Sequence, residues 1–451
     1  MKPQTSPLKD RRFQILALAC LSAALAVPRA LPGVPMGVDS SSHLYKIMFM
    51  HDSYRLHGFI SDWSPGWYGG FSPFQLYPPL SYYIVFYLAL AGLGPIAAYK
   101  LVELLFYIAA PITVYFLALE LKLSRTESLA SAAIFTFTPS VVENLLFYDR
   151  FPNLVALPAM NVFLIAFHKL LTGRLKLRYV SAPGLLLAAL ILTHHLTALL
   201  AFSVALLMAL TWALAKGRLR ESLIGATAVP ASSIAASSFW LVPFASKALL
   251  ANGNPFYNRN VLDAAYMKAT YFIQHTVAYS FGAAAFVLAV AAAVGPLTWL
   301  GGKRGKASSA LFLAGLLLGT ALFELCLTAG LRAPRALGQI LLALGFSAII
   351  VETLRLARRR LGSETAFTQL WFLTYLWLSL GGHAVPFSNL EAIPYVKVAP
   401  IQKLWLSLDI QRFWLLLAAP MAMLASKPLV KALSGAGGRL KKTSKKRAFM
   451  P

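Results

Sequence analysis

Charged residues, and acidic residues above all, are scarce in this 451-residue chain. Only 13% of its residues are charged, about half the fraction usual for a soluble domain, whereas 58% are hydrophobic and the mean hydropathy is +0.65. This balance excludes a soluble globular protein. It predicts an all-α polytopic membrane protein, because each segment of about 20 apolar residues can cross a bilayer as a helix that satisfies its own backbone groups.

Cysteine is almost absent, with Cys20 and Cys326 the two in the chain. Both fall in apolar segments, which argues against a disulfide framework and against a metal-thiolate site. The sequence also has no glycine-rich phosphate loop, no Cys/His metal spacing and no internal repeat. No cofactor is therefore predicted from motifs, and a requirement for Mg²⁺ or Mn²⁺ stays open.

Basic residues, in contrast, are abundant, and their positions explain a net charge of +25. They gather in short connections between apolar runs, which is the pattern of cytoplasmic loops under the positive-inside rule. We therefore expect both termini in the cytoplasm, a location in the cell membrane, and no nucleic-acid partner. The basic segments are KDRR near residue 9, KLSR near 122, KLLTGRLKLR near 169, KGRLR near 216, GGKRGK near 302, RLARRR near 355 and GRLKKTSKKR near 438.

The alternation of apolar and basic segments predicts about twelve transmembrane helices in one domain over 1–430, followed by a basic cytoplasmic tail over 431–451. The run 79–93 is too short to span and is expected to lie on or dip into the outer surface. A long first external loop covers 32–96. The predicted spans lie near 13–31, 97–120, 127–147, 154–171, 179–194, 196–214, 222–245, 276–299, 308–329, 335–355, 366–384 and 411–426.

The first external loop concentrates polar groups between Gly37 and Leu80, and with this topology nearly all aspartates face outward. Asp39 and His43 are four residues apart, so a helix would place them on one face. A carboxylate beside an imidazole suits proton abstraction, with His43 orienting Asp39 or binding a phosphate oxygen. The alternative is that Asp39 caps the helix that follows it.

This loop resembles that of polyprenyl-phosphate-dependent glycosyltransferases of the C-type membrane fold (GT-C). More narrowly, it is similar to the membrane proteins labelled pyruvoyl-tetrahydropterin-synthase-related. Further segments agree with this resemblance, namely FYDRFPNLVALP at 147–158, LTHHLTA at 192–198 and LDIQRFW at 408–414. The loop residues that carry it are Asp39, His43, Trp67, Gly69, Gly70, Tyr77, Pro78 and Pro79.

The resemblance implies a GT-C-like fold in which a carboxylate of the first external loop is the general base of an inverting sugar transfer. It also implies a polyprenyl-phosphate sugar donor and membrane lipids as partners at the outer face. The chain departs from the pattern in one respect: no adjacent acidic pair follows the first span. This departure leaves both metal dependence and a peptide acceptor in doubt.

Other polar residues near external ends of spans complete the candidate site. Asp149 is a candidate catalytic carboxylate next to Arg150, a candidate substrate ligand; the alternative is a turn with a local ion pair. An ionised lipid phosphate needs cationic partners, and each arginine among them has the alternative role of an interfacial anchor. The remaining candidate substrate-binding residues are Arg332, Arg335, Lys403, Arg412, His194, His195, Trp67 and Tyr77.

Three glutamates inside predicted spans support a rival function. Glu103, Glu143 and Glu324 would each cost about 2.5 kcal/mol or more if ionised in the bilayer, and such residues often mark transport pathways. A polyprenyl-lipid or solute transporter therefore remains an alternative, as does a non-catalytic lipid-binding protein. Against the transporter, the chain has one long loop beside its first span rather than short loops on both faces.

Overall fold

Local sequence signals set where the helices begin. In this computed structural model, which describes residues 10–66, 69–174, 176–250, 280–329, 332–380 and 411–447, helix α1 (Arg11–Ala30) begins after Asp10, whose carboxylate accepts a hydrogen bond from the Arg12 backbone at 2.9 Å. Helix α5 (Arg125–Thr136) begins with a capping box between Ser124 and Glu127. Each cap satisfies backbone groups that a helix end leaves without partners.

Nine helices among the described residues are long and apolar enough to cross a membrane, or ten if one bent pair forms a single span. The bent pair is α5 with α6 (Pro139–Leu146), which meet at 48°. One of the nine continues from α14 through the π-turn Gly315–Gly319 into α15 (Thr320–Thr328). The others are α1, α4 (Pro95–Glu120), α7 (Phe151–Leu171), α9 (His195–Lys216), α10 (Leu219–Leu250), α13 (Ser280–Leu300), α16 (Arg332–Ala357) and α19 (Gln411–Arg447), with α14 at Gly302–Ala314.

The all-helical membrane fold is as predicted, but two of the twelve predicted spans are shorter than expected. The segment 179–194 forms α8 (Ser181–Thr193), which has 13 residues, and 366–384 begins with α17 (Ser363–Ser379), which has 17. At 1.5 Å per residue, α8 reaches only about 20 Å, less than the roughly 30 Å of the hydrocarbon core. The break between α8 and α9 falls at His194, where the predicted spans 179–194 and 196–214 meet.

The short segment 79–93, within the first external loop, has the expected length. It forms α3 (Leu80–Leu88) and a π-turn over Ala89–Leu93, and it ends where Gly92 and Gly94 adopt φ angles of 105° and 73°. Glycine tolerates such left-handed backbone angles, so the chain can turn sharply into α4. Its depth in the membrane stays a prediction.

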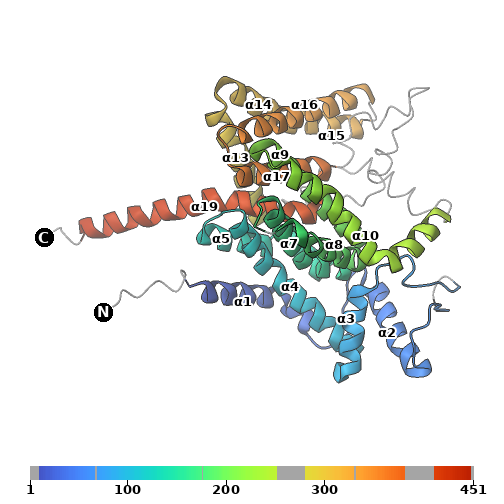
Figure 1. Cartoon of the computed structure of the whole chain (residues 1–451). Helices are drawn as coiled ribbons and strands as arrows, with labels where there is room; N and C mark the ends of the chain where they lie inside the picture. The colour runs from blue at the N-terminus through green and yellow to red at the C-terminus, as the bar shows by residue number, and fades with distance from the viewer. Residues whose placement is uncertain are drawn as a thin grey trace.

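The bundle has two chemically different ends. Figure 1 shows the start of α1 and the end of α19 on one side, with α2 (Ser40–His57) and α3 on the other. We call these the basic end and the loop end. Ion pairs gather the predicted cytoplasmic turns at the basic end: Arg174 with Glu120, and Lys122 with Glu364. Helix α19 runs unbroken to Arg447, so the predicted tail begins as a helix.

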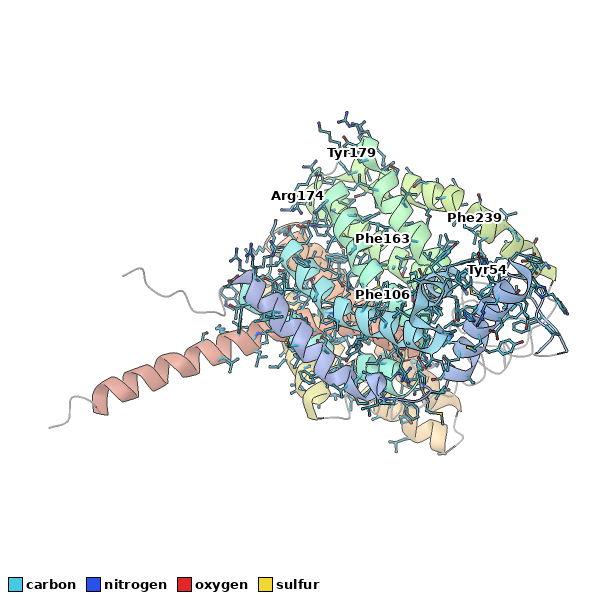
Figure 2. All side chains as sticks on the ribbon, turned by 90° about the horizontal axis from the view of Figure 1, so that it is seen from below. Tyr54, Phe106, Phe163, Arg174, Tyr179 and Phe239 are labelled. Atoms are coloured by element: carbon cyan, nitrogen blue, oxygen red, sulfur yellow. The ribbon has the colours of Figure 1, made fainter. Side chains whose placement is uncertain are left out.

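Burial within the bundle is uneven, as expected for helices that face lipid. The apolar windows of α7 and α19 are 72% and 78% buried, whereas that of α10 is 22% buried. Large apolar side chains such as Phe239 and Trp299 are exposed, and Figure 2 shows Phe239 on the same side as Tyr54 of α2. Apolar exposure on this scale is expected on surfaces that contact lipid chains.

Candidate functional site

The segment Gly37–Ser40 is held by the turn that connects α6 to α7. The backbone N–H groups of Val38 and Asp39 donate hydrogen bonds to the carbonyl oxygens of Phe147 and Tyr148, at 3.0 and 2.9 Å. A side chain at Gly37 would place its Cβ 2.5 Å from the Cβ of Asp149. The close approach therefore requires glycine, and it fixes the backbone of Asp39 against a segment far away in the sequence.

A buried charge cluster lies beneath this contact. The guanidinium of Arg29, near the end of α1, donates two hydrogen bonds to Glu103 of α4, at 2.8 and 3.0 Å, and lies 2.7 Å from Asp149. Tyr99 donates to the second oxygen of Asp149 at 2.6 Å, and Ser40 also hydrogen-bonds Asp149. Three helices, α1, α2 and α4, and the turn between α6 and α7 thus meet at one arginine and two carboxylates.

Asp149 is fully buried in this cluster and adopts a positive φ of 53°. Burial by itself would raise its pKa, but the charge of Arg29 and the hydrogen bonds from Ser40 and Tyr99 outweigh burial and lower the pKa of Asp149 below its usual value. Its ion-pair partner is Arg29 of a distant helix, whereas the guanidinium of Arg150 lies 4.4 Å above the ring of Tyr148. With these partners, Asp149 is better suited to hold Ser40 and the neighbouring backbone in place than to contact a substrate.

Asp39 precedes the first residue of α2, but its side chain makes no capping hydrogen bond to the helix. Its half-buried carboxylate interacts electrostatically with Lys46, two turns further along the helix. Burial lowers the pKa of Lys46 to about 8, and the nearby charge of Asp39 opposes this shift. The hydrogen bond that would make Asp39 the capping side chain of α2, the alternative role considered from the sequence, is therefore not formed.

Lys46 lines a cavity of about 370 Å³ between α2, the first loop and the end of α10, which we call the Lys46 cavity. The ammonium group of Lys46 donates to the Ser42 hydroxyl at 2.8 Å and lies 5.1 Å from the centre of the Tyr77 ring. Trp63 and Lys247 also line the cavity. Its wall therefore combines two cationic side chains with aromatic rings and hydroxyl groups.

The end of α10 reaches this cavity because its aromatic side chains dock on the loop end. The indole of Trp240 donates to the carbonyl oxygen of Phe74 at 2.7 Å. His195, a predicted substrate ligand, lies against the rings of Trp240 and Phe244, at centroid distances of 6.3 and 5.3 Å. His195 thus belongs to the aromatic contact that brings α10 to the loop.

The two other predicted histidines have structural partners. His43 is buried, and its Nδ1 lies 2.7 Å from the hydroxyl of Tyr82 in α3. His194 precedes α9, where its Nδ1 accepts a hydrogen bond from the Thr197 backbone at 3.2 Å and lies 2.7 Å from the Thr197 hydroxyl. His194 therefore caps α9.

The remaining predicted ligands cannot be placed in the site. Trp67 and Lys403 lie outside the described residues. Arg332 and Arg335 lie in the first turn of α16, and Arg412 in that of α19, but their side chains lie outside the described part of the structure. Their assignment to a lipid phosphate stays a prediction.

Metal binding by the described residues finds no support in the geometry. Within the described ranges no group of three or more His, Cys, Asp or Glu side chains is arranged to hold a metal ion. Asp149 has Arg29 as its neighbour, and Asp39 has Lys46, so the two candidate carboxylates each face a cation.

Three residues of the site were not among the sequence candidates. Lys46 follows Asp39 at helical spacing, which indicated that the two side chains could lie on one face of a helix. The structure adds that Lys46 is buried, which the spacing did not show. Arg29 carries a charge inside an apolar segment, which by itself indicates a partner such as Glu103. Nothing in the sequence near Lys247 indicates that α10 would bring it to the first loop.

Gly37→Ala should disturb the site by overpacking. The new methyl group would also lie 3.1 Å from the Phe147 carbonyl oxygen and the Ser40 hydroxyl, so we expect a loss of about 1–3 kcal/mol in stability. Thermal unfolding in detergent measures this loss. Gly295→Ala is the control, because a Cβ there meets nothing within 4 Å; equal stability of the two variants would contradict the contact.

These features define a class: an all-helical polytopic membrane protein with a buried charge cluster and a cationic, aromatic cavity at one end of its bundle. A family model described as "6-pyruvoyl-tetrahydropterin synthase related domain; membrane protein" matches residues 74–433. The chain belongs to this family, as the sequence resemblance predicted.

Two further comparisons add little at the level of individual proteins. No match is found among curated proteins. Among solved structures, the chain is similar to the oligosaccharyltransferase AglB from Archaeoglobus fulgidus, in complex with an inhibitory peptide and a dolichol-phosphate, at 12% identity and a TM-score of 0.35. The match covers 93% of this chain but 56% of that one, so the chain spans little more than half of that protein's length.

Proposed function

We propose that this protein is a GT-C-like membrane glycosyltransferase that moves a sugar from a polyprenyl-phosphate-linked donor to an acceptor at the loop end. The observation that carries the proposal is the electrostatic interaction of Asp39 with the buried Lys46, whose side chain lines an aromatic cavity. Sugar transfer from a lipid phosphate needs a base, a cation for the phosphate and a surface for the sugar. The described residues offer candidates for all three at the start of α2, in the loop after it and at the end of α10.

Asp39 would act as the general base. Its carboxylate takes the proton of the acceptor hydroxyl as that oxygen bonds to the anomeric carbon of the sugar. The bond from that carbon to the phosphate oxygen breaks on the opposite face, and the phosphate leaves with the electron pair, which inverts the configuration. The main-chain hydrogen bonds that hold Asp39 to Tyr148 would keep the base in place as charge develops.

Lys46 and Lys247 would bind the donor phosphate. An ammonium group near the leaving oxygen stabilises the negative charge that grows there during transfer. The exposed ring of Trp63 and the half-buried ring of Tyr77 lie on the same cavity wall and suit the apolar face of a sugar. Lys46 connects this wall to Asp39, with which it interacts electrostatically, and its ammonium group lies 5.1 Å from the centre of the Tyr77 ring.

Asp149 would act as a positioning residue rather than as the catalytic carboxylate predicted from the sequence. It accepts a hydrogen bond from Ser40, the residue after Asp39, while Arg29 neutralises it from below. Glu103 was one of the glutamates that motivated the transporter alternative. The two hydrogen bonds that it accepts from Arg29 give Glu103 a structural role, so it supports the transporter alternative less.

Orientation and location follow from charge. Because basic turns gather at one end of the bundle, we place that end and both termini on the cytoplasmic side of the cell membrane. The Lys46 cavity would then open at the outer face, where a lipid-linked donor could be reached from the membrane.

Binding of a lipid phosphate should weaken as the pH rises through about 8. Lys46, with a pKa of about 8, loses its charge in that range, so the affinity should fall by up to about tenfold per pH unit. The loss of this charge does not destabilise the fold. Between the pKa of about 8 in the folded protein and the ordinary value of 10.5, the unfolded chain binds more protons at this lysine than the folded protein does. The contribution of Lys46 to the free energy of unfolding therefore rises with pH in this range. Titration of a fluorescent polyprenyl phosphate at pH 7, 8 and 9 measures the effect, and Lys46→Arg should remove the pH dependence.

The proposal is tested first by mass spectrometry of the lipids that co-purify with the protein. We expect a polyprenyl phosphate, with or without its sugar, in wild type and a reduced amount in Lys46→Met. Lys100→Met is the matched control, because this lysine also lies at the loop end but donates to the Leu31 carbonyl outside the cavity. Equal lipid in all three proteins would contradict the role of Lys46.

A further inference from the structure

A second charged cavity lies at the basic end, on the opposite side of the bundle from the proposed transfer site. Its volume is about 560 Å³, and it lies between the end of α9 and the end of α16, two helices that contact each other. Leu214 contributes from α9, and Val351, Leu354 and Arg355 from α16. Arg358 and Arg359 complete the lining just beyond α16. We call this the arginine cavity.

The charges around this cavity are unequally neutralised. Glu352, almost fully buried, accepts hydrogen bonds from Arg355 at 2.8 and 2.5 Å and lies 3.6 Å from Arg304. One carboxylate thus serves two arginines. Arg358 and Arg359 are exposed, and neither forms an ion pair within the described part of the chain. The cavity therefore keeps a positive charge that no described protein group balances.

The rest of the cavity lining is apolar. Leu214 and Val351 are 39% and 53% exposed, and each belongs to a helix that qualifies as a membrane span. Arginines in the last turn of a span lie at the depth of phospholipid headgroups, whereas the residues one turn earlier lie at the depth of the acyl chains. The cavity is thus cationic at headgroup level and apolar just below it.

We infer that the arginine cavity binds an anionic phospholipid of the leaflet at the basic end. The headgroup phosphate would accept paired hydrogen bonds from the guanidinium groups of Arg358 and Arg359, a geometry that arginine provides and lysine does not. The upper part of an acyl chain would lie on Leu214 and Val351. Basic pockets between spans on the cytoplasmic side are suited to such headgroups. This site is independent of the proposed transfer reaction.

The inference is tested with delipidated full-length protein in detergent. Dioleoyl phosphatidylglycerol, dioleoyl phosphatidylcholine or inorganic phosphate is added, and native mass spectrometry measures the bound lipid while thermal unfolding measures stabilisation. We expect phosphatidylglycerol to bind and to raise the unfolding temperature more than the other two. The double variant R358Q/R359Q should lower its affinity about tenfold or more, and Leu214→Gln should lower it as well.

The control separates a site from diffuse attraction. R178Q/R220Q removes the same charge from two exposed arginines at the same end that do not line the cavity, and it should retain the affinity of wild type. Equal losses in both double variants would overturn the inference in favour of diffuse charge attraction. Equal stabilisation by inorganic phosphate would overturn the lipid assignment, and unchanged binding in R358Q/R359Q would overturn the site itself. The fold of each variant is checked by circular dichroism and gel filtration.

Discussion

Asp39→Asn should abolish sugar transfer while leaving the protein folded. A general base contributes about 10²–10⁴-fold to a rate, and asparagine cannot accept the acceptor proton. The backbone N–H of residue 39, which donates to Tyr148, is unchanged by the substitution, and the Asp39 side chain makes no capping bond to α2. We therefore expect a loss of at least about 10²-fold in kcat, with co-purified lipid and thermal unfolding close to those of wild type.

Asp52→Asn is the matched control for this prediction. Asp52 lies on α2, the helix that follows Asp39, but it is 58% exposed and its carboxylate lies 3.1 Å from Nδ1 of its neighbour His51. It should keep full activity. If Asp39→Asn instead lowered expression or the unfolding temperature without a specific loss of transfer, Asp39 would be a structural residue and the assignment of the base would be wrong.

Arg29→Met should destabilise the protein more than Gly37→Ala does. It leaves the carboxylates of Glu103 and Asp149 buried beside each other without the cation that both contact. Removing one partner of a buried ion pair typically costs about 3–5 kcal/mol, because the remaining charge stays desolvated. Thermal unfolding in detergent should show a much lower midpoint than that of wild type.

Two further variants identify the cause of this loss. Arg11→Met removes an exposed arginine from the same helix and should leave the midpoint nearly unchanged. The triple variant R29M/E103Q/D149N removes the stranded charges and should recover part of the lost stability. If the triple variant were less stable than Arg29→Met, the loss would come from packing of the arginine rather than from unpaired carboxylates.

The fold was predictable from sequence to the extent that apolar length determines it. The spans around Cys20 and Phe163 could be read directly, because a long apolar run has one stable arrangement in a bilayer. Helices α8 and α17 were placed correctly in the sequence, but with 13 and 17 residues they are shorter than the predicted spans. The capping side chain of His194 and the end of α17 at Ser379 depend on local hydrogen bonds that hydropathy does not record.

The site was predictable only where its residues are close in the sequence. Asp39, Lys46 and Tyr77 come from one continuous segment, and the helical spacing of Asp39 and Lys46 was a signal for their proximity, although Lys46 was not among the sequence candidates. The contact between Asp149 and Arg29 could not be predicted, because it joins residues 120 positions apart through the packing of α1 against α4. Sequence neighbours suggested an ion pair of Asp149 with Arg150, but the positive φ of Asp149 directs its side chain to the buried cluster instead.

The most direct test of the proposed function is transfer itself. Purified wild-type protein is incubated with radiolabelled polyprenyl-phosphate sugars and an acceptor extract from membranes and cell walls, with Asp39→Asn as the blank. We predict labelled product that appears with wild type, is absent with the variant, and carries the inverted anomeric configuration. Bound polyprenyl lipid without transfer from any donor would contradict the enzyme and favour a lipid transporter or a non-catalytic lipid-binding protein.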